Sequence, residues 1–396
     1  MDIKKFILEL REQEDSSQID LCTPQFVKND FDYRNSLFEK YKSIKKIACK
    51  YNLGILNEEM DMIIEAIDNY YNGEIDRSLK LILETVEVLK NNKYICSPFN
   101  QSGAFTNFSC NKLISQVDLY KARIAKNIDI ENKYSMFHIP FNMREIITTQ
   151  RFSIPGVPCV YLGKTIYTSW MELDKPADSD FYVSRARVND DISIFNLAVN
   201  FDHICEWANA KELEIDIDNE RFLIDYTRVW LLSLASSYVV KQYNRNFKSE
   251  YIIPQLLMLS LKKMGIPAIA YYSKRISENE PNRNFAPLNV NVAIIMDAND
   301  IFKNELNHNI YSKLMDKIEL SEPVNFSEYK NINWFRPSQI GKSDNIQAEG
   351  MYVSKYINVA NEWFEYTHTD FAGLEKFIAG CNLNQKSLQG EVEISG

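Results

Sequence analysis

Apolar residues recur at helical spacing through the first 95 residues of the chain. Positions three or four residues apart fall on one face of a helix, so each run predicts an amphipathic helix. The three stripes comprise Leu37, Tyr41, Ile44, Ala48 and Tyr51, then Met60, Ile63, Ile64 and Ile67, then Ile75, Leu79, Ile82, Val86 and Leu89. Because amphipathic helices bury such stripes, residues 1–95 are predicted to form a small helical bundle.

Short apolar runs bounded by turns replace the helical stripes after residue 113, which is typical of strands. Strands are predicted at residues 114–124, 159–162, 181–188, 192–197, 268–273 and 290–295. Two helices interrupt them, one over residues 220–241 and one that begins near Pro254 and ends before Gly265. The chain is therefore expected to have an α+β fold, with mixed β-sheets and flanking helices after the bundle.

The remaining segments are mostly polar. Residues 92–113 are rich in turn formers and predict a linker, and residues 321–350 predict a loop. Two further helices are predicted over residues 300–318 and 355–379. Residues 382–396 carry no core pattern, so this tail is expected to be mobile.

Composition narrows the class of protein. Of the 396 residues, 45% are hydrophobic and 25% are charged, which is ordinary for a globular chain. The formal net charge of −9 argues against a general nucleic-acid binder, which would carry a basic field. The seven cysteines include no CxxC pair and no zinc-ligand spacing. The N-terminus lacks the pattern of a signal peptide and no long apolar window is present, so a cytoplasmic location away from membranes is expected.

Candidate chemistry gathers in residues 134–187. Arg151 opens a turn rich in proline and glycine, which forces a sharp chain reversal. A buried run containing Tyr161 follows, and the helix predicted over 165–173 carries Glu172 near its end. An arginine, a tyrosine and a carboxylate could therefore converge on one cleft.

This arrangement resembles the RES domain, a bacterial family with an ADP-ribosyltransferase-like fold whose members include toxins that destroy NAD. The family pattern has two early arginines, a strand of V-Y-L type, a helix with a glutamate, and then a late serine and an asparagine. The matching residues are Arg123, Arg151, Tyr161, Glu172, Ser273 and Asn291. The resemblance covers roughly residues 95–300, and it departs from the pattern at Phe152 and Ser153, where many toxin members have Trp-Asn.

The resemblance implies three domains. Residues 1–95 are similar to the helical N-terminal domains of longer family members, and a docking or regulatory role is expected for them. HEPN-type domains that cut RNA use an Arg with a His a few residues on, and the four histidines of this chain all lie after residue 95, so the bundle is not expected to be a nuclease. Residues 96–300 are the expected NAD-binding catalytic domain, and residues 301–396 a mainly helical extension packed on it.

The implied activity is cleavage of the nicotinamide–ribose bond of NAD, with phosphate or water as acceptor, in a toxin–antitoxin or anti-phage defence role. A carboxylate would stabilise the oxocarbenium-like ribose, and arginines would hold the pyrophosphate. The expected catalytic residues are Glu172, Arg151 and Ser273, and the expected NAD-binding residues are Arg123, Tyr161, His138 and Asn291. NAD is then a substrate, and neither a metal nor a tightly bound cofactor is expected.

Plainer interpretations of these residues stay open. A single arginine often serves a structural ion pair, a strand tyrosine is often packed, and Glu172 could be a solvated helix-end carboxylate. His138 completes the His-Tyr-Glu order of diphtheria-like transferases, yet a histidine beside Pro140 is more often structural. Alternative functions are transfer of ADP-ribose to a macromolecule and non-catalytic binding of NAD or ADP-ribose. Candidate partners besides NAD and phosphate are a second copy of the chain and an antitoxin or regulatory protein at the helical bundle.

Overall fold

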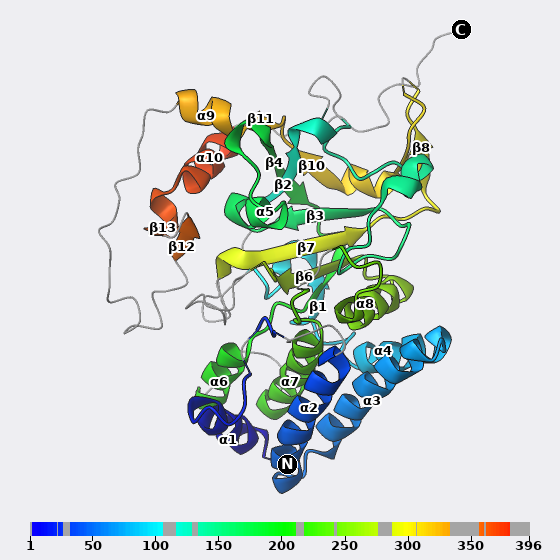
Figure 1. Cartoon of the computed structure of the whole chain (residues 1–396), viewed down its shortest axis with the longest axis vertical. Helices are drawn as coiled ribbons and strands as arrows, with labels where there is room; N and C mark the ends of the chain where they lie inside the picture. The colour runs from blue at the N-terminus through cyan, green and yellow to red at the C-terminus, as the bar shows by residue number, and fades with distance from the viewer. Residues whose placement is uncertain are drawn as a thin grey trace.

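A curled β-sheet and a group of helices beneath it form the two layers of the molecule (Figure 1). The computed structural model describes residues 2–21, 23–26, 32–105, 116–128, 134–210, 218–240, 244–275, 287–305, 307–332, 356–359 and 362–380. Its mixture of helices with a largely antiparallel sheet confirms the expected α+β class. Within these ranges, no helix has the length and apolar character needed to cross a membrane.

The helical layer joins the start of the chain to its middle. It contains α1 (Ile3–Asp15), α2 (Asp32–Lys50), α3 (Gly54–Tyr71), α4 (Ile75–Glu87), α6 (Phe201–Asn209), α7 (Asn219–Ala235) and α8 (Ile252–Lys263). The apolar stripes of the sequence are buried as predicted, except that Tyr51 is half-buried and Ile75 is exposed at the first turn of α4. All seven helices contribute to one apolar core, so α1–α4 do not pack on one another alone. The proposed domain boundary at residue 95 stays a prediction.

Polar contacts tie the same helices together. The hydroxyl of Tyr33 in α2 donates to the Ala235 carbonyl at 3.0 Å, and that of Tyr41 donates to Leu231 at 2.7 Å. Glu59 of α3 forms an ion pair with Arg228 of α7. Burial raises the pKa of Glu59 to about 7, although Arg228 acts in the opposite direction.

The main sheet has the strand order β1-β5-β6-β7-β3-β2-β4-β10, with β11 also paired to β4. β5 and β6 are parallel, and the other neighbouring strands are antiparallel. The strands are β1 (Cys96–Pro98), β2 (Leu119–Ile124), β3 (Cys159–Gly163), β4 (Phe181–Val188), β5 (Ser193–Asn196), β6 (Ala268–Tyr272), β7 (Val290–Ile295), β10 (Ile318–Leu320) and β11 (Val324–Asn325). β4 and β7 have the bounds that the sequence predicted.

The two faces of this sheet differ in what covers them. Side chains alternate between faces along a strand, and in β7 Ala293 and Ile295 pack into the core shared with α7 and α8. We call this side the helix face. Ile294, between them in sequence, belongs to a separate core that also includes Leu119 of β2. We call that side the opposite face.

Asparagines explain why the helix predicted over residues 300–318 is wrong. This stretch contains β8 (Ile301–Lys303), β9 (Ile310–Ser312) and the 3-10 helix η7 (Lys313–Lys317). The Asn304 side chain accepts a hydrogen bond from the Asn307 amide, and the Asn307 side chain accepts one from the Asn309 amide. Such local bonds compete with helical ones and favour the turn between β8 and β9.

The helix predicted over residues 355–379 is correct only in its second half. The first half forms the hairpin β12 (Tyr356–Val359) and β13 (Glu362–Glu365), whose β-branched and aromatic residues favour strands. The helix α10 (Asp370–Ala379) begins after Thr369, whose hydroxyl caps it by accepting from the Ala372 amide at 3.3 Å. The extension after residue 300 is therefore mixed rather than mainly helical in its described part, because β10 and β11 complete the main sheet.

Three smaller expectations also change. The segment 92–113, expected to be a linker, contains β1 and the 3-10 helix η1 (Phe99–Gln101), and its residues 106–113 lie outside the described residues. α7 ends at Ala235, earlier than predicted, and Tyr238 forms a bridge with Gln25 instead. In the stretch predicted as a loop, Phe326–Ile332 forms α9, and residues 333–350 lie outside the described residues, as does the tail 382–396.

Candidate active site

A close contact between a strand end and a short helix positions Glu172. The helix α5 (Ile166–Glu172) starts at Thr165, whose hydroxyl accepts a hydrogen bond from the Thr168 amide at 3.1 Å. Gly163, at the end of β3, lies so near this first turn that a Cβ there would be 2.9 Å from the Thr165 carbonyl oxygen. Ser169 donates to the Tyr120 carbonyl at 3.1 Å and so links α5 to β2. The glycine therefore lets α5 lie directly on the sheet, with Glu172 at its last turn.

A second set of contacts holds the start of α5. Glu375 of α10 accepts a hydrogen bond from the Ile166 amide at 2.8 Å and another from the Tyr366 hydroxyl. Burial raises the pKa of Glu375 to about 7, while the two hydrogen bonds and Lys164 act in the opposite direction. The helix that carries Glu172 is thus fixed by the sheet on one side and by α10 on the other.

The carboxylate of Glu172 meets two residues that the resemblance also singles out. Its Oε1 accepts hydrogen bonds from the Ser273 hydroxyl at 2.7 Å and from the Asn291 amide group at 2.6 Å. Its Oε2 lies 3.7 Å from Nε of Arg275. Ser273 is fully buried and Asn291 is 4% exposed, whereas the Glu172 side chain remains 34% exposed. The structure therefore brings together Glu172, Ser273 and Asn291 from separate parts of the chain, with the carboxylate reachable from outside.

Arg151 is occupied by main-chain groups. One guanidinium nitrogen donates to the carbonyls of Ser236 at 3.0 Å and Glu250 at 3.3 Å, and the other donates to Tyr238 at 2.7 Å. The guanidinium also lies 5.1 Å from the centre of the Tyr251 ring. In this geometry Arg151 fastens the segment after α7 to the segment before α8. Whether it also holds a ligand stays a prediction.

Tyr161 supports the turn that follows Arg151. It lies on β3, and its hydroxyl donates to the Phe152 carbonyl at 2.9 Å. The Phe152 ring packs against Tyr271 with 4.2 Å between ring centres. Phe152 is fully buried, which gives a packing reason for an aromatic residue there. The position of the Tyr161 hydroxyl indicates a structural contact, and stacking on a ligand stays a prediction.

Arg123 and His138 lie elsewhere. Because Leu119 belongs to the opposite face and strand residues alternate, Arg123 of β2 also projects toward that face. Arg123 donates to the Phe137 carbonyl. His138 donates from Nδ1 to the Ile139 carbonyl at 2.7 Å and accepts from the Ser312 amide at Nε2, at 2.9 Å. Burial is the main cause that lowers the pKa of His138 to about 4. The structure does not bring these two residues to Glu172.

Lys274 is a candidate that the sequence analysis missed. It directly follows Ser273 and is only 7% exposed. Burial lowers its pKa to about 7, with Arg151 acting in the same direction and Glu172 in the opposite one. Both of these side chains thus act on the lysine electrostatically. A lysine next to the serine of the pattern was the available signal, but a single lysine in a sequence does not reveal its burial.

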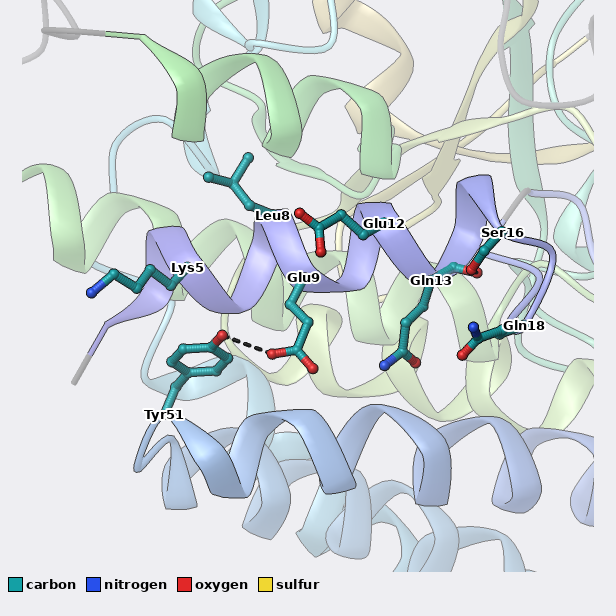
Figure 2. Close-up of a pocket in the computed structure, with 8 residues that line it drawn as sticks. All are labelled: Lys5, Leu8, Glu9, Glu12, Gln13, Ser16, Gln18 and Tyr51. Carbon is teal, nitrogen blue, oxygen red and sulfur yellow. Dashed lines mark hydrogen bonds between the residues drawn. The ribbon is translucent and has the colours of Figure 1, made fainter.

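A separate surface hollow of ≈ 590 Å³ lies along α1, and Figure 2 shows the residues that line it. Its lining includes Glu9, Glu12 and Lys5, with Tyr51 at one end, and none of the residues near Glu172. The Tyr51 hydroxyl donates to Glu9 at 2.7 Å, and Lys50 pairs with the same carboxylate. The hollow is therefore not lined by Glu172, Ser273 or Asn291. In the described ranges, no cluster of three or more His, Cys, Asp or Glu residues could hold a metal ion.

The geometry around Glu172 suits stabilisation of a positive charge. Two neutral donors hold one oxygen, so the carboxylate is oriented before any ligand arrives, and its exposed part can face a developing cation. Cleavage of a glycosidic bond passes through such an oxocarbenium-like state. The same geometry could also hold a ribose hydroxyl, because a carboxylate oxygen accepts more than one hydrogen bond.

Comparison with known proteins shows a partial similarity to a protein named as a toxin. The chain is 38% identical over 157 residues to a Bacillus subtilis (strain 168) protein with the printed name "Putative toxin YopC". The similar stretch spans 38% of this chain and 35% of the relative, so the chain matches about a third of that protein's length. No family model matches the chain, and no solved structure matches it. Similarity to a toxin-like protein is thus established, and the RES domain and its NAD chemistry stay predictions.

Proposed function

We propose that this chain is a toxin-like enzyme that cleaves the bond between nicotinamide and ribose in NAD. The observation that carries the proposal is the pair of hydrogen bonds from Ser273 and Asn291 to Oε1 of Glu172. These residues were selected by resemblance, from positions about a hundred residues apart, and they meet in space. The printed name of the relative supports only the toxin-like part of the proposal, and the similarity covers only part of each chain.

In the proposed reaction the C–N bond between ribose and nicotinamide breaks, and its electron pair leaves with nicotinamide. Glu172 faces the positive charge that forms on the ribose. An oxygen of water or phosphate then bonds to the same ribose carbon and loses its proton to solvent. Ser273 and Asn291 keep the carboxylate in place throughout. A role of the activity in bacterial toxin–antitoxin or anti-phage systems is part of the proposal.

The test is incubation of the purified full chain with NAD, with and without inorganic phosphate, followed by identification of products by mass spectrometry. Nicotinamide with ADP-ribose indicates hydrolysis, and nicotinamide with a phosphorylated ADP-ribose indicates phosphorolysis. Intact NAD in both conditions, with a protein that is folded by circular dichroism, would overturn the proposal. Nicotinamide release that requires an added protein acceptor would instead identify a transferase.

A further inference from the structure

Lys274 combines burial with a lack of partners. It is 7% exposed, and among the described residues its amine makes no hydrogen bond and no ion pair. Burial of an unpaired charge is costly, so buried lysines normally have an anionic partner. Lys274 directly follows Ser273 in the chain, and the Ser273 hydroxyl donates a hydrogen bond to Glu172. Its position near the candidate site is therefore fixed, while its charge is not compensated by a contact.

The neighbouring cations differ from Lys274 in this respect. Arg151 donates to three carbonyls, and Arg275 lies 3.7 Å from Glu172. Glu172 is the anion that acts on Lys274, but two of its hydrogen bonds already come from Ser273 and Asn291. A ligand bound beside Glu172 would thus lie close to a lysine that Glu172 already influences electrostatically and that has no hydrogen-bond acceptor among the described residues.

We propose that Lys274 is a phosphate-binding residue, whose ammonium group pairs with a phosphate oxygen of the ligand bound beside Glu172. The inference rests on the proposed function, because NAD, and phosphate where it is the acceptor, are the anions of that reaction. Two sources share this chemistry: the diphosphate of NAD and inorganic phosphate as the attacking group. Lysine serves as a point charge for either.

Binding of a phosphate group at Lys274 is coupled to uptake of a proton by the lysine. In the free protein the pKa of Lys274 is about 7, because burial and Arg151 lower it while Glu172 raises it. A phosphate oxygen at the amine favours the charged form and raises the pKa. Slightly above neutral pH, the ligand therefore binds together with a proton. Affinity falls as the pH rises above the pKa of the free protein.

The experiment is isothermal titration calorimetry of the full chain with ADP-ribose at pH 7.5, in two buffers of different ionisation enthalpy and without phosphate. ADP-ribose lacks nicotinamide, so binding is measured apart from turnover. The wild-type protein is expected to take up a fraction of a proton. Lys274→Met should weaken binding by about tenfold to a hundredfold, the effect of one charge-assisted hydrogen bond, and should abolish the proton uptake.

Two further variants separate charge from structure. Lys274→Arg should keep most of the affinity without proton uptake, because arginine stays charged. Lys263→Met removes an exposed lysine in the last turn of α8 and should change neither quantity. A parallel titration of wild type and Lys274→Met with inorganic phosphate identifies the source, since phosphate binding that is weakened in Lys274→Met would assign Lys274 to the acceptor.

The outcomes remain decisive if Lys274→Met does not fold, because proton uptake is also measured on the wild-type protein. Binding of both ligands without proton uptake, or no binding of either, overturns the inference. Wild-type affinity in a folded Lys274→Met protein does the same. If Lys274-dependent binding occurs but NAD is left intact, the phosphate site stands and the proposed reaction fails. If NAD is cleaved equally well by the Lys274→Met protein, the reaction stands and this inference fails.

Discussion

On the helix face of the sheet, Glu172 receives hydrogen bonds from the side chains of Ser273 and Asn291 and is 34% exposed. On the opposite face, Arg123 and His138 direct their hydrogen bonds to main-chain groups, and His138 is 2% exposed. Both regions contain residues that the resemblance proposed for NAD chemistry. Their partners differ, and so do the functions that their geometry supports.

The two regions differ in whether their polar side chains hold the chain in place or remain available to a ligand. A side chain bonded to distant main-chain groups fixes the path of the chain, and its loss leaves buried carbonyls or amides without partners. A side chain oriented by other side chains, and still open on one side, is ready to meet a ligand. By this criterion Arg151, with its three carbonyl acceptors, belongs with Arg123 and His138, although Arg151 and Glu172 both act electrostatically on Lys274.

The largest effect is expected for Glu172→Gln, which tests whether the Glu172 carboxylate acts on a ligand. The amide keeps the shape and one acceptor oxygen but loses the negative charge, so NAD cleavage should fall by about 10²–10³, as for loss of one preorganised electrostatic contact. Steady-state rates of nicotinamide release, with ADP-ribose affinity measured in parallel, check it. The matched control is Glu145→Gln, an exposed glutamate in η3 (Phe141–Ile146), which should keep wild-type rates. Unchanged turnover in Glu172→Gln would remove this carboxylate from the mechanism.

Glu250, the other carboxylate that might be considered, does not suit that role. It is fully buried, and both its oxygens accept from Arg245, at 2.9 and 3.0 Å. Although its partner is a side chain, Glu250 has no open side that could face a ligand.

A second test concerns Arg151. Arg151→Met leaves three carbonyls without this donor, so the free energy of unfolding should fall by about 2–4 kcal/mol. Denaturant unfolding of the full chain measures it, with the exposed Arg144→Met as a control that should stay within about 0.5 kcal/mol. Wild-type stability together with a large loss of ADP-ribose affinity would return Arg151 to the ligand-binding group.

The third and smallest effect is a pH dependence on the opposite face. Burial lowers the pKa of His138 from 6.5 to about 4, and the nearby Arg123 and Lys121 act in the same direction. A histidine with a depressed folded-state pKa stabilises the protein above its unfolded pKa of 6.5, and this contribution is lost as the pH falls toward 4. Thermal unfolding of wild type and His138→Gln between pH 7 and 4 should therefore differ by an amount on the order of 1–3 kcal/mol across the window.

The exposed variant His368→Gln is the control for this test, and it should retain the wild-type loss of stability in acid. NAD cleavage by His138→Gln near neutral pH should stay close to that of wild type. Identical acid dependence of wild type and His138→Gln would show that the histidine is not buried in its neutral form.

The sequence predicted those elements whose periodicity is regular and local. β4 and β7 have the expected bounds because β-branched and aromatic residues are frequent in them, and the helix predicted over 165–173 corresponds to α5, which is one residue shorter at each end. The 300–318 helix was wrong because asparagine side chains compete with the helical backbone there. The periodicity of apolar residues does not reveal such competition for hydrogen bonds.

The candidate site was predictable only as far as side-chain type allows. The meeting of Glu172 with Ser273 and Asn291 was implied by the resemblance and not by spacing. The partners of Arg151 could not be predicted, because they are the main-chain carbonyls of residues 236, 238 and 250, and residue type does not indicate which carbonyls accept a hydrogen bond. Lys274 was missed for a related reason, since its burial depends on tertiary packing around a strand end.

The apolar core that joins α1–α4 to α6–α8 also has a consequence for biosynthesis. The ribosome makes α1–α4 first, but the helices that cover their apolar sides are not complete until Lys263 has been added. Until then the native cover of the N-terminal helices is incomplete, and Ser273 and Asn291, which follow Lys263 in the chain, have not been added. A chain released early would therefore lack both its core and its candidate site. Translation itself thus delays any activity until most of the polypeptide exists.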